Sequence, residues 1–135
     1  MTHTDLARGF EIEIPDGWKI SGGLLDWLVN LFEKNAVTAM APRQEGFARM
    51  AVTVRNVDRE ALKRHLVTYS SETYVSVAGL PATAVRYDRQ GCAFRKFSVI
   101  SEKSFREYLI QFGYDDAWPE FDSIIDRVVK SFRLL

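Results

Sequence analysis

The sequence predicts an α+β domain in which helices pack on an antiparallel sheet. Four segments with a β pattern follow one another between Thr73 and Phe112, and the stretches between them are too short for the crossover that parallel strands require. The final segment, residues 118–135, repeats its apolar residues with helical spacing. These observations predict β-hairpins followed by a C-terminal amphipathic helix.

Size and charge narrow the class of protein. The chain has 135 residues, of which 47% are hydrophobic and 13% aromatic, so residues 1–135 are predicted to form a single domain with one core. Lysine plus arginine equals aspartate plus glutamate, at 18 each. Because no cationic excess would attract a phosphate backbone, a nucleic-acid partner is not expected.

The first half of the chain contains three predicted strands. The segment FEIEIP, residues 10–15, alternates apolar and charged side chains as a half-buried strand does, and residues 1–8 ahead of it are expected to be a loose head. A second strand is predicted at 37–41 and a third at 47–57. The core face of the third strand is expected to consist of Ala48, Met50, Val52 and Val54.

A helix and four more strands follow. Asp58 is suited to cap a helix over residues 59–70, since its carboxylate can accept a hydrogen bond from a free backbone N–H of the first turn. Glycine-containing or polar turns then separate the strands, with Gly79, Leu80 and Pro81 forming the first of these turns. The strands are the segments TYVSVAG (73–79), ATAVRYD (82–88), CAFRKFSVI (92–100) and SFREYLIQF (104–112).

The last helix has the clearest period in the chain. Pro119 suits its first turn, where a missing N–H has no cost, and Asp115 and Asp116 suit its N-terminal dipole. Its apolar stripe consists of Phe121, Ile124, Ile125, Val128, Val129 and Phe132.

The most apolar run is LLDWLVNLF, residues 24–32. It is nine residues long, whereas a membrane-spanning helix needs about 20 apolar residues, so no membrane span is expected. In one interpretation this short amphipathic helix closes one end of the core. In the other, Leu24, Trp27, Leu28 and Leu31 form a surface for an unidentified protein partner or for a second copy in a homodimer.

Basic residues cluster in the last three strands. Arg86, Arg95 and Arg106 are the candidates for binding an acidic partner or a phosphate, and alternation places Arg86 and Arg106 on the same sheet surface. The alternative is a solvated sheet rim, because arginine and lysine at sheet edges also prevent unwanted strand pairing.

Residues that could support chemistry are sparse. His3 and His65 are far apart and lack the spaced ligands of a metal site, and no catalytic residues, cofactor site or metal site are predicted. Cys92 has no cysteine to pair with and no evident activating base.

Several short motifs, in order, resemble the PsbP-like superfamily, which includes the extrinsic photosystem II subunit, bacterial DcrB-type proteins and a eukaryotic Ran-binding import factor. The resemblance covers nearly the full chain, and the apolar run at 24–32 is its main departure. The motifs are FEIEIPDGW (10–18), VTV (52–54), GLPA (79–82) leading to Tyr87, YLI (108–110), WPEF (118–121) and SFR (131–133).

This resemblance implies an α/β/α sandwich around a twisted antiparallel sheet, used as a non-catalytic protein-binding or assembly module. A second resemblance, to DcrB-like cytosolic chaperones, implies the alternative of a chaperone or adaptor that shields apolar helices of a secreted effector or membrane protein. The first residues lack the pattern of a signal peptide. We therefore expect a cytoplasmic protein if Met1 is the native start, and otherwise a mature periplasmic or cell-surface domain.

Overall fold

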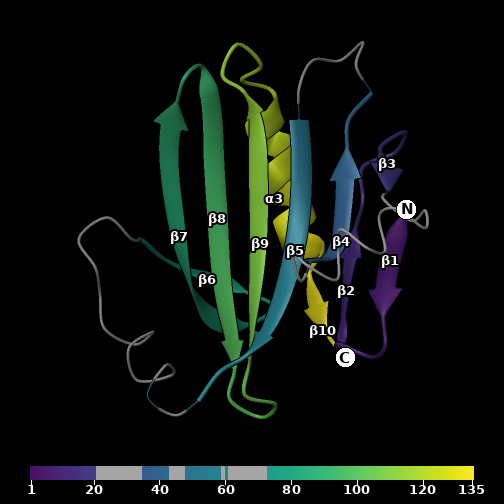
Figure 1. The fold of residues 1–135 in the computed structure, drawn as a ribbon, viewed down its shortest axis with the longest axis vertical. Coiled ribbons are helices and arrows are strands. Elements are labelled where there is room, and N and C mark those ends of the chain that lie inside the picture. The colour runs from purple at the N-terminus through teal and green to yellow at the C-terminus, as the bar shows by residue number, and fades with distance from the viewer. Residues whose placement is uncertain (21–34, 43–47, 59, 61–72) are drawn as a thin grey trace.

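The structure, a computed structural model, describes residues 1–20, 35–42, 48–58, 60 and 73–135 (Figure 1). Within these ranges ten strands form two antiparallel sheets, and the helix α3 (Phe121–Ser131) packs against them. The strands are β1 (Thr2–Asp5), β2 (Phe10–Glu13), β3 (Lys19–Ile20), β4 (Asn35–Met40), β5 (Ala48–Asn56), β6 (Thr73–Val77), β7 (Leu80–Arg89), β8 (Cys92–Ser101), β9 (Arg106–Asp115) and β10 (Arg133–Leu134).

Seven strands form the large sheet, in the order β3-β4-β5-β9-β8-β7-β6. The predicted hairpins are confirmed, and two of them have two-residue turns with positive φ at both positions. These turns are Ala78–Gly79 (φ 53° and 75°) and Gln90–Gly91 (φ 52° and 79°), a geometry that follows the strand twist. Because two residues suffice for the first turn, Leu80 and Pro81 belong to β7 and not to the turn that the sequence predicts.

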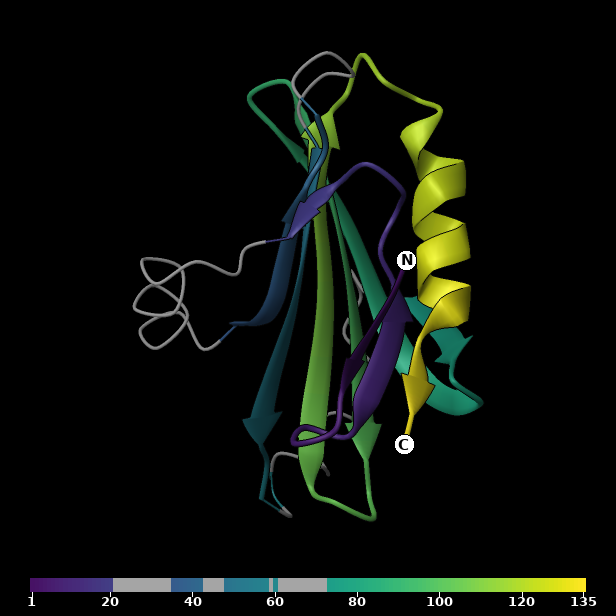
Figure 2. The ribbon, with the colours of Figure 1, turned by 90° about the vertical axis from the view of Figure 1, so that its right-hand side faces the viewer.

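The core lies on one face of the large sheet. Figure 2 shows α3 on that face, together with the small sheet β1-β2-β10. Alternate side chains of the long strands point into this layer, as the period of two predicts. Among them are the predicted Ala48, Met50 and Val52 of β5 and, on β9, Tyr108, Ile110, Phe112 and Tyr114, all of them buried.

The helix α3 confirms the predicted apolar stripe. Phe121, Ile125, Val128 and Val129 are buried, and the Phe121 ring stacks on Trp18 with ring centroids 5.5 Å apart. The helix begins later than the sequence predicts, so Pro119 precedes it and is not in its first turn. Phe132 follows its last residue but is still buried.

The acidic residues at this helix start also differ from the prediction. Asp115 ends β9, and its Oδ1 accepts a hydrogen bond from the Ala117 N–H, so it holds the turn between β9 and α3. Asp122 is the acid in the first turn of α3, where a negative charge interacts favourably with the helix dipole.

The small sheet corrects the predicted loose head at residues 1–8. Thr2–Asp5 forms β1, which pairs antiparallel with β2 along its whole length, so His3 lies opposite Ile12. The polar segment THTD carries no apolar alternation, and only its pairing with β2 makes it a strand.

Two predicted helices cannot be compared with the structure. The run at 24–32 and nearly all of 59–70 lie outside the described residues. The coarse fold class is confirmed by the rest: a mostly antiparallel sheet with a C-terminal amphipathic helix.

Candidate functional site

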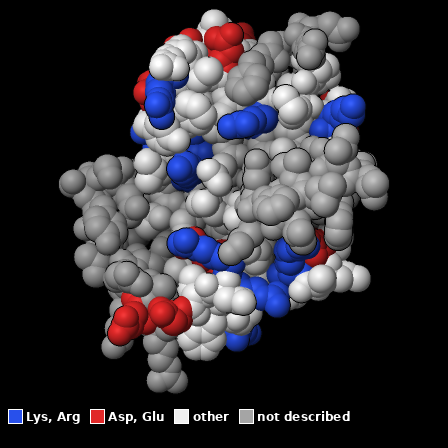
Figure 3. Space-filling model, viewed as in Figure 1, with Lys and Arg blue, Asp and Glu red and all other residues white. Residues whose placement is uncertain are grey.

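The outer face of the large sheet, which is the face directed away from α3, holds the candidate site. Strand registers place its side chains in rows across the strands. The first row contains Tyr87, Phe94, Gly113 and Arg49, and the second contains Val85, Lys96, Gln111, Ala51 and Thr38. Figure 3 looks onto this face and shows lysine and arginine side chains at several places on it.

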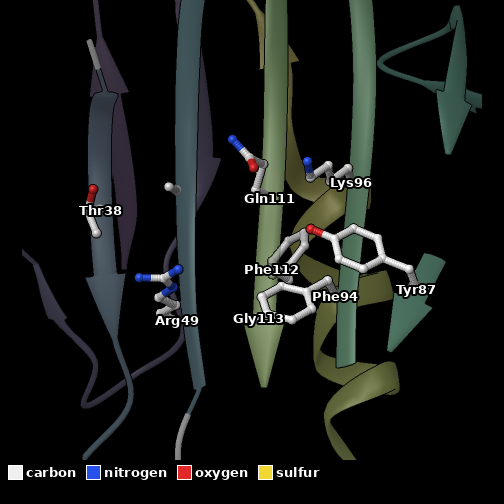
Figure 4. A pocket seen from close by; sticks show the side chains of 9 residues that line it. Thr38, Arg49, Tyr87, Phe94, Lys96, Gln111, Phe112 and Gly113 are labelled. Carbon is white, nitrogen blue, oxygen red and sulfur yellow. The ribbon is translucent and has the colours of Figure 1, made fainter. Parts of the chain in front are cut away.

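Residues of these two rows line an open hollow of about 310 Å³. A second hollow of about 340 Å³ lies beside it, and Lys96 lines both. The first hollow is lined, among the described residues, by Thr38, Arg49, Ala51, Tyr87, Phe94, Lys96, Gln111, Phe112 and Gly113, most of which are seen in Figure 4.

A pair of aromatic rings forms one wall of the first hollow. The rings of Tyr87 and Phe94 stack with centroids 4.9 Å apart and an interplanar angle of 13° (Figure 4). The ammonium of Lys96 lies 5.5 Å from the centroid of the Tyr87 ring, within the range of a cation–π interaction. Since Tyr87 is 39% exposed, the wall presents apolar ring surface to solvent.

Gly113 explains why the Phe94 ring can lie flat on the neighbouring strand. A Cβ at this position would stand 3.2 Å from Cε1 of Phe94, closer than ordinary contact. Glycine in the interior of a strand weakens it, and such a position often marks a close approach by another group. Here the approaching group is the Phe94 ring, so Gly113 sets the depth of the hollow beside Arg49.

The charge of the first hollow is one-sided. Arg49 and Lys96 contribute two cations, and none of its described lining residues is acidic. The second hollow differs, because its Arg55 pairs with Glu107 at 2.6 Å between Nε and Oε1. The first hollow is therefore complementary to a negatively charged group.

Two of the predicted basic site residues meet on the opposite side of the sheet, beneath α3. Arg86 and Arg95 lie directly across from each other on β7 and β8. Both guanidinium groups reach Asp122 of α3, at 3.3 and 3.4 Å, and Arg95 also reaches Asp126 at 3.3 Å. Their charges are thus largely offset within the protein.

A tyrosine completes this cluster. The Tyr114 hydroxyl donates a hydrogen bond of 2.7 Å to Oδ1 of Asp122. Burial, the hydrogen bond and the Asp122 charge together raise the pKa of Tyr114 to about 12. Burial by itself would raise the pKa of Asp122, but the hydrogen bond from Tyr114 and the charges of Arg86 and Arg95 outweigh it and hold that pKa below its ordinary value.

Arg106 lies apart from the other two arginines. It shares their side of the sheet, as alternation predicts for Arg86 and Arg106, but it stands at the opposite end of the long strands. Its Nη1 donates a hydrogen bond to the carbonyl oxygen of Ala7. The three arginines therefore do not form one patch.

The other predicted partner-binding residues cannot be compared with the structure. Leu24, Trp27, Leu28 and Leu31 lie outside the described residues, as does His65. In the part of the chain that the structure describes, no group of three or more His, Cys, Asp or Glu side chains is placed to hold a metal ion.

Sequence reasoning did not find the hollow on the outer face. Its members come from β4, β5, β7, β8 and β9, and only the strand registers bring them together. One signal was present in the sequence: Gly113 stands between two aromatic residues in a strand, and an isolated glycine in a strand suggests a close approach at that point.

Comparison with solved structures identifies the fold. The cyanobacterial PsbP (CyanoP) from Synechocystis sp. PCC 6803 is similar with a TM-score of 0.68, over 100% of this chain and 92% of that one, at 11% sequence identity. The fold is PsbP-like. A protein from Bacteroides thetaiotaomicron VPI-5482 has a TM-score of 0.56 at 12% identity, over 93% of this chain and 45% of that one. At these identities the PsbP-like fold transfers no site.

The sequence searches add no closer relative. No protein-family model matches the sequence, and no curated protein matches it. Among the described residues, none of the helical segments is both long and apolar enough to cross a membrane.

Proposed function

We propose that this PsbP-like protein is a non-catalytic protein-binding or assembly module. The observation that carries the proposal is the outer face of the large sheet, where two adjoining hollows share Lys96 and expose a stacked aromatic pair. Aromatic side chains and arginine are enriched where protein partners bind.

The shape of this face supports a protein partner over a small molecule. Together the hollows extend over five strands, β4, β5, β9, β8 and β7, and remain open to solvent. Small-molecule sites are usually enclosed and bury most of the ligand surface. An extended, shallow face suits a segment of another chain.

We also propose the α/β/α sandwich. The helix α3 supplies one helical layer. The predicted helix at 59–70 would supply the other on the outer face of the large sheet, beside the hollows and without covering Arg49 and Lys96. Protection of backbone amides at 62–70 in hydrogen exchange would support this helix, whereas exchange as fast as in an unfolded peptide would contradict it.

The predicted partner surface formed by Leu24, Trp27, Leu28 and Leu31 remains a separate proposal, as does partner binding through Arg86, Arg95 and Arg106. Binding or homodimer formation through the run at 24–32 is tested by a double variant, Trp27→Asp with Leu28→Asp. Its oligomeric state in sedimentation is compared with that of the wild type after circular dichroism has shown that it folds.

The main experiment is affinity capture of the tagged protein from its native cells, followed by mass spectrometry. An outer-face variant, Arg49→Glu with Lys96→Glu, is compared with the wild type and with a control, Lys130→Glu, on the exposed side of α3. We expect a specific partner that is retained by the control and lost by the outer-face variant. A partner bound equally by all three proteins, or no partner at all, would contradict binding through this face.

A further inference from the structure

We propose that the first hollow of the outer face binds an extended acidic segment of a partner protein, and this inference rests on the proposed function. Carboxylates of the segment would meet Arg49 and Lys96, and an apolar or aromatic side chain would lie on the exposed ring of Tyr87. The proposal names the chemistry of the partner, which the protein-binding function alone leaves open.

The cationic side chains of the large sheet differ in whether a carboxylate of the protein lies beside them. Arg55, Arg86 and Arg95 each approach a carboxylate within 3.4 Å. Arg49 and Lys96 form no ion pair with any residue that the structure describes. The cations of the hollow are therefore available to a carboxylate from outside.

The second step is the proximity of these two cations. Arg49 on β5 and Lys96 on β8 are separated by β9, and their positions differ by one row. Strand and residue spacings place their Cα atoms roughly 12 Å apart. A ligand that carries two negative charges can therefore meet both cations of the hollow.

The third step concerns the length of the ligand. Residues i and i+2 of an extended chain present side chains on the same side about 6.6–6.8 Å apart, and i and i+4 about twice as far. Two carboxylates on one side of an extended segment thus match the distance between Arg49 and Lys96. The amide of Gln111, between them in the second row, can bond to the backbone of such a segment.

The fourth step is the aromatic wall. The Tyr87–Phe94 stack stands at the β7 side of the hollow, and the Phe94 ring occupies space that a side chain at Gly113 would need. An apolar side chain that covers the exposed part of Tyr87 removes ring surface from water. This apolar contact would fix the position of the segment along the hollow, which the two charge contacts alone do not fix.

A nucleic acid fits these observations less well. Duplex DNA carries one negative charge per about 1.7 Å, and proteins that bind it present many cations. The hollow offers two, and the formal net charge of the whole chain is +0. A short acidic peptide is matched by two cations and one apolar wall.

The test starts from a displayed library of random 16-residue peptides, selected on the immobilised wild-type protein. The selected peptides are then synthesised with a fluorescent label and titrated by fluorescence anisotropy. We expect enrichment of aspartate and glutamate two or four residues apart, next to an aromatic or large apolar residue.

Two variants locate the binding. For the selected peptides, Arg49→Gln with Lys96→Gln is expected to weaken binding roughly tenfold, because it removes both charge contacts. The control Lys130→Gln, on α3, is expected to bind like the wild type. Raising the salt concentration should weaken binding to the wild type and have less effect on the double variant.

Results that contradict an acidic segment can be distinguished from results that contradict the proposed protein-binding function. Selected peptides that lack acidic residues, or that bind the double variant as well as the wild type, would overturn the acidic segment while leaving a protein-binding role intact. Failure to select any peptide would overturn it too. Tighter binding of a labelled oligo(dT) than of any peptide, lost in the same double variant, would assign the hollow to nucleic acid instead.

Discussion

The two faces of the large sheet use the same kinds of side chain for different purposes. On the face beneath α3, Arg86 and Arg95 lie close to Asp122 and Asp126 of the helix. On the outer face, Arg49 and Lys96 line a hollow without a described acidic partner. The aromatic residues divide in the same way, since Phe121 is fully buried while Tyr87 remains 39% exposed.

This difference shows that a cation in a strand cannot be interpreted from the strand alone. Neighbouring positions on β8, Arg95 and Lys96, point to opposite faces and meet opposite surroundings. The helix that covers one face supplies the acids there. On the other face, Arg49 and Lys96 have no acidic partner among the described residues, and changes on the two faces should therefore differ in kind.

The largest effect is expected in the aromatic core beneath the helix. Phe121 contacts the rings of Trp18, Tyr114 and Trp118, and Phe121→Ala should lower the free energy of unfolding by about 3–5 kcal/mol. The matched change on the outer face, Phe94→Ala, should cost about 1 kcal/mol, because its ring is half-buried and loses mainly one stacking contact. Urea unfolding of both variants measures the difference. Equal losses would contradict the division between core and outer face.

A smaller effect is expected at Gly113, where the packing of the outer face requires a residue without a side chain. Gly113→Val would place carbon atoms against the Phe94 ring, whose Cε1 is 3.2 Å from the position of a Cβ. Overpacking of this kind costs about 1–3 kcal/mol. We expect a lower urea midpoint and a changed near-ultraviolet circular dichroism signal from the displaced Tyr87–Phe94 stack. An unchanged spectrum and midpoint would show that the stack does not rest on Gly113.

The acid cluster beneath the helix should give a pH-dependent effect. The pKa of Asp122 is lower in the folded chain than its ordinary value of 3.8, so the folded state holds this proton less tightly than the unfolded state does. The resulting stabilisation is present above pH 3.8 and is lost as the pH falls through the lowered pKa. Asp122→Asn should therefore be less stable than the wild type at pH 7 and should show a weaker loss of stability below about pH 4.

The same cluster predicts the opposite behaviour in alkali. Because the pKa of Tyr114 is raised from 10.0 to about 12, its stabilisation is present below pH 10 and is lost as the pH rises towards 12. Tyr114→Phe serves as the control that removes this dependence. Thermal unfolding from pH 3 to 11 measures both trends, and parallel curves for wild type and variants would contradict the role of the Tyr114–Asp122 hydrogen bond.

The smallest effect is expected for the cations themselves. Arg95→Gln loses two ion pairs and the contact of its guanidinium with the Phe97 ring at 5.2 Å, so it should cost about 1 kcal/mol. Arg49→Gln should change stability by less than about 0.5 kcal/mol, since it removes an exposed side chain without an ion pair to a described residue. A larger loss for Arg49→Gln in urea unfolding would mean that the outer-face cations are structural as well.

Local patterns were sufficient to predict much of the fold. The alternation at Phe10 and Ile12 and the stripe from Phe121 to Val129 are visible in the sequence because burial imposes the period of each element. Short connections between strands predicted the hairpins. The PsbP-like resemblance rested on turns, strand ends and buried aromatics, which are the features that determine a fold.

The candidate site could not be predicted because it depends on the exact registers between strands, which the alternation within each strand does not determine. Arg49 and Gly113 are neighbours only through the β5–β9 register, and Tyr87 meets Phe94 only through the β7–β8 register. The same reason explains the arginines: alternation correctly placed Arg86 and Arg106 on one surface, but the register puts Arg95 opposite Arg86 and leaves Arg106 at the far end.

The small sheet has a consequence for how the protein folds. The strand β2 lies near the start of the chain, yet its neighbour β10 and the Phe132 ring, stacked on Phe10 at 5.9 Å, come more than a hundred residues later. The Ser131 hydroxyl oxygen also accepts a hydrogen bond of 2.8 Å from the Glu13 N–H. Contacts between such distant segments form slowly, because a long loop must close before they contribute. The pairing of Arg133 and Leu134 with β2 therefore raises the contact order of the fold, and loss of residues 133–135 would leave one edge of β2 without its partner strand.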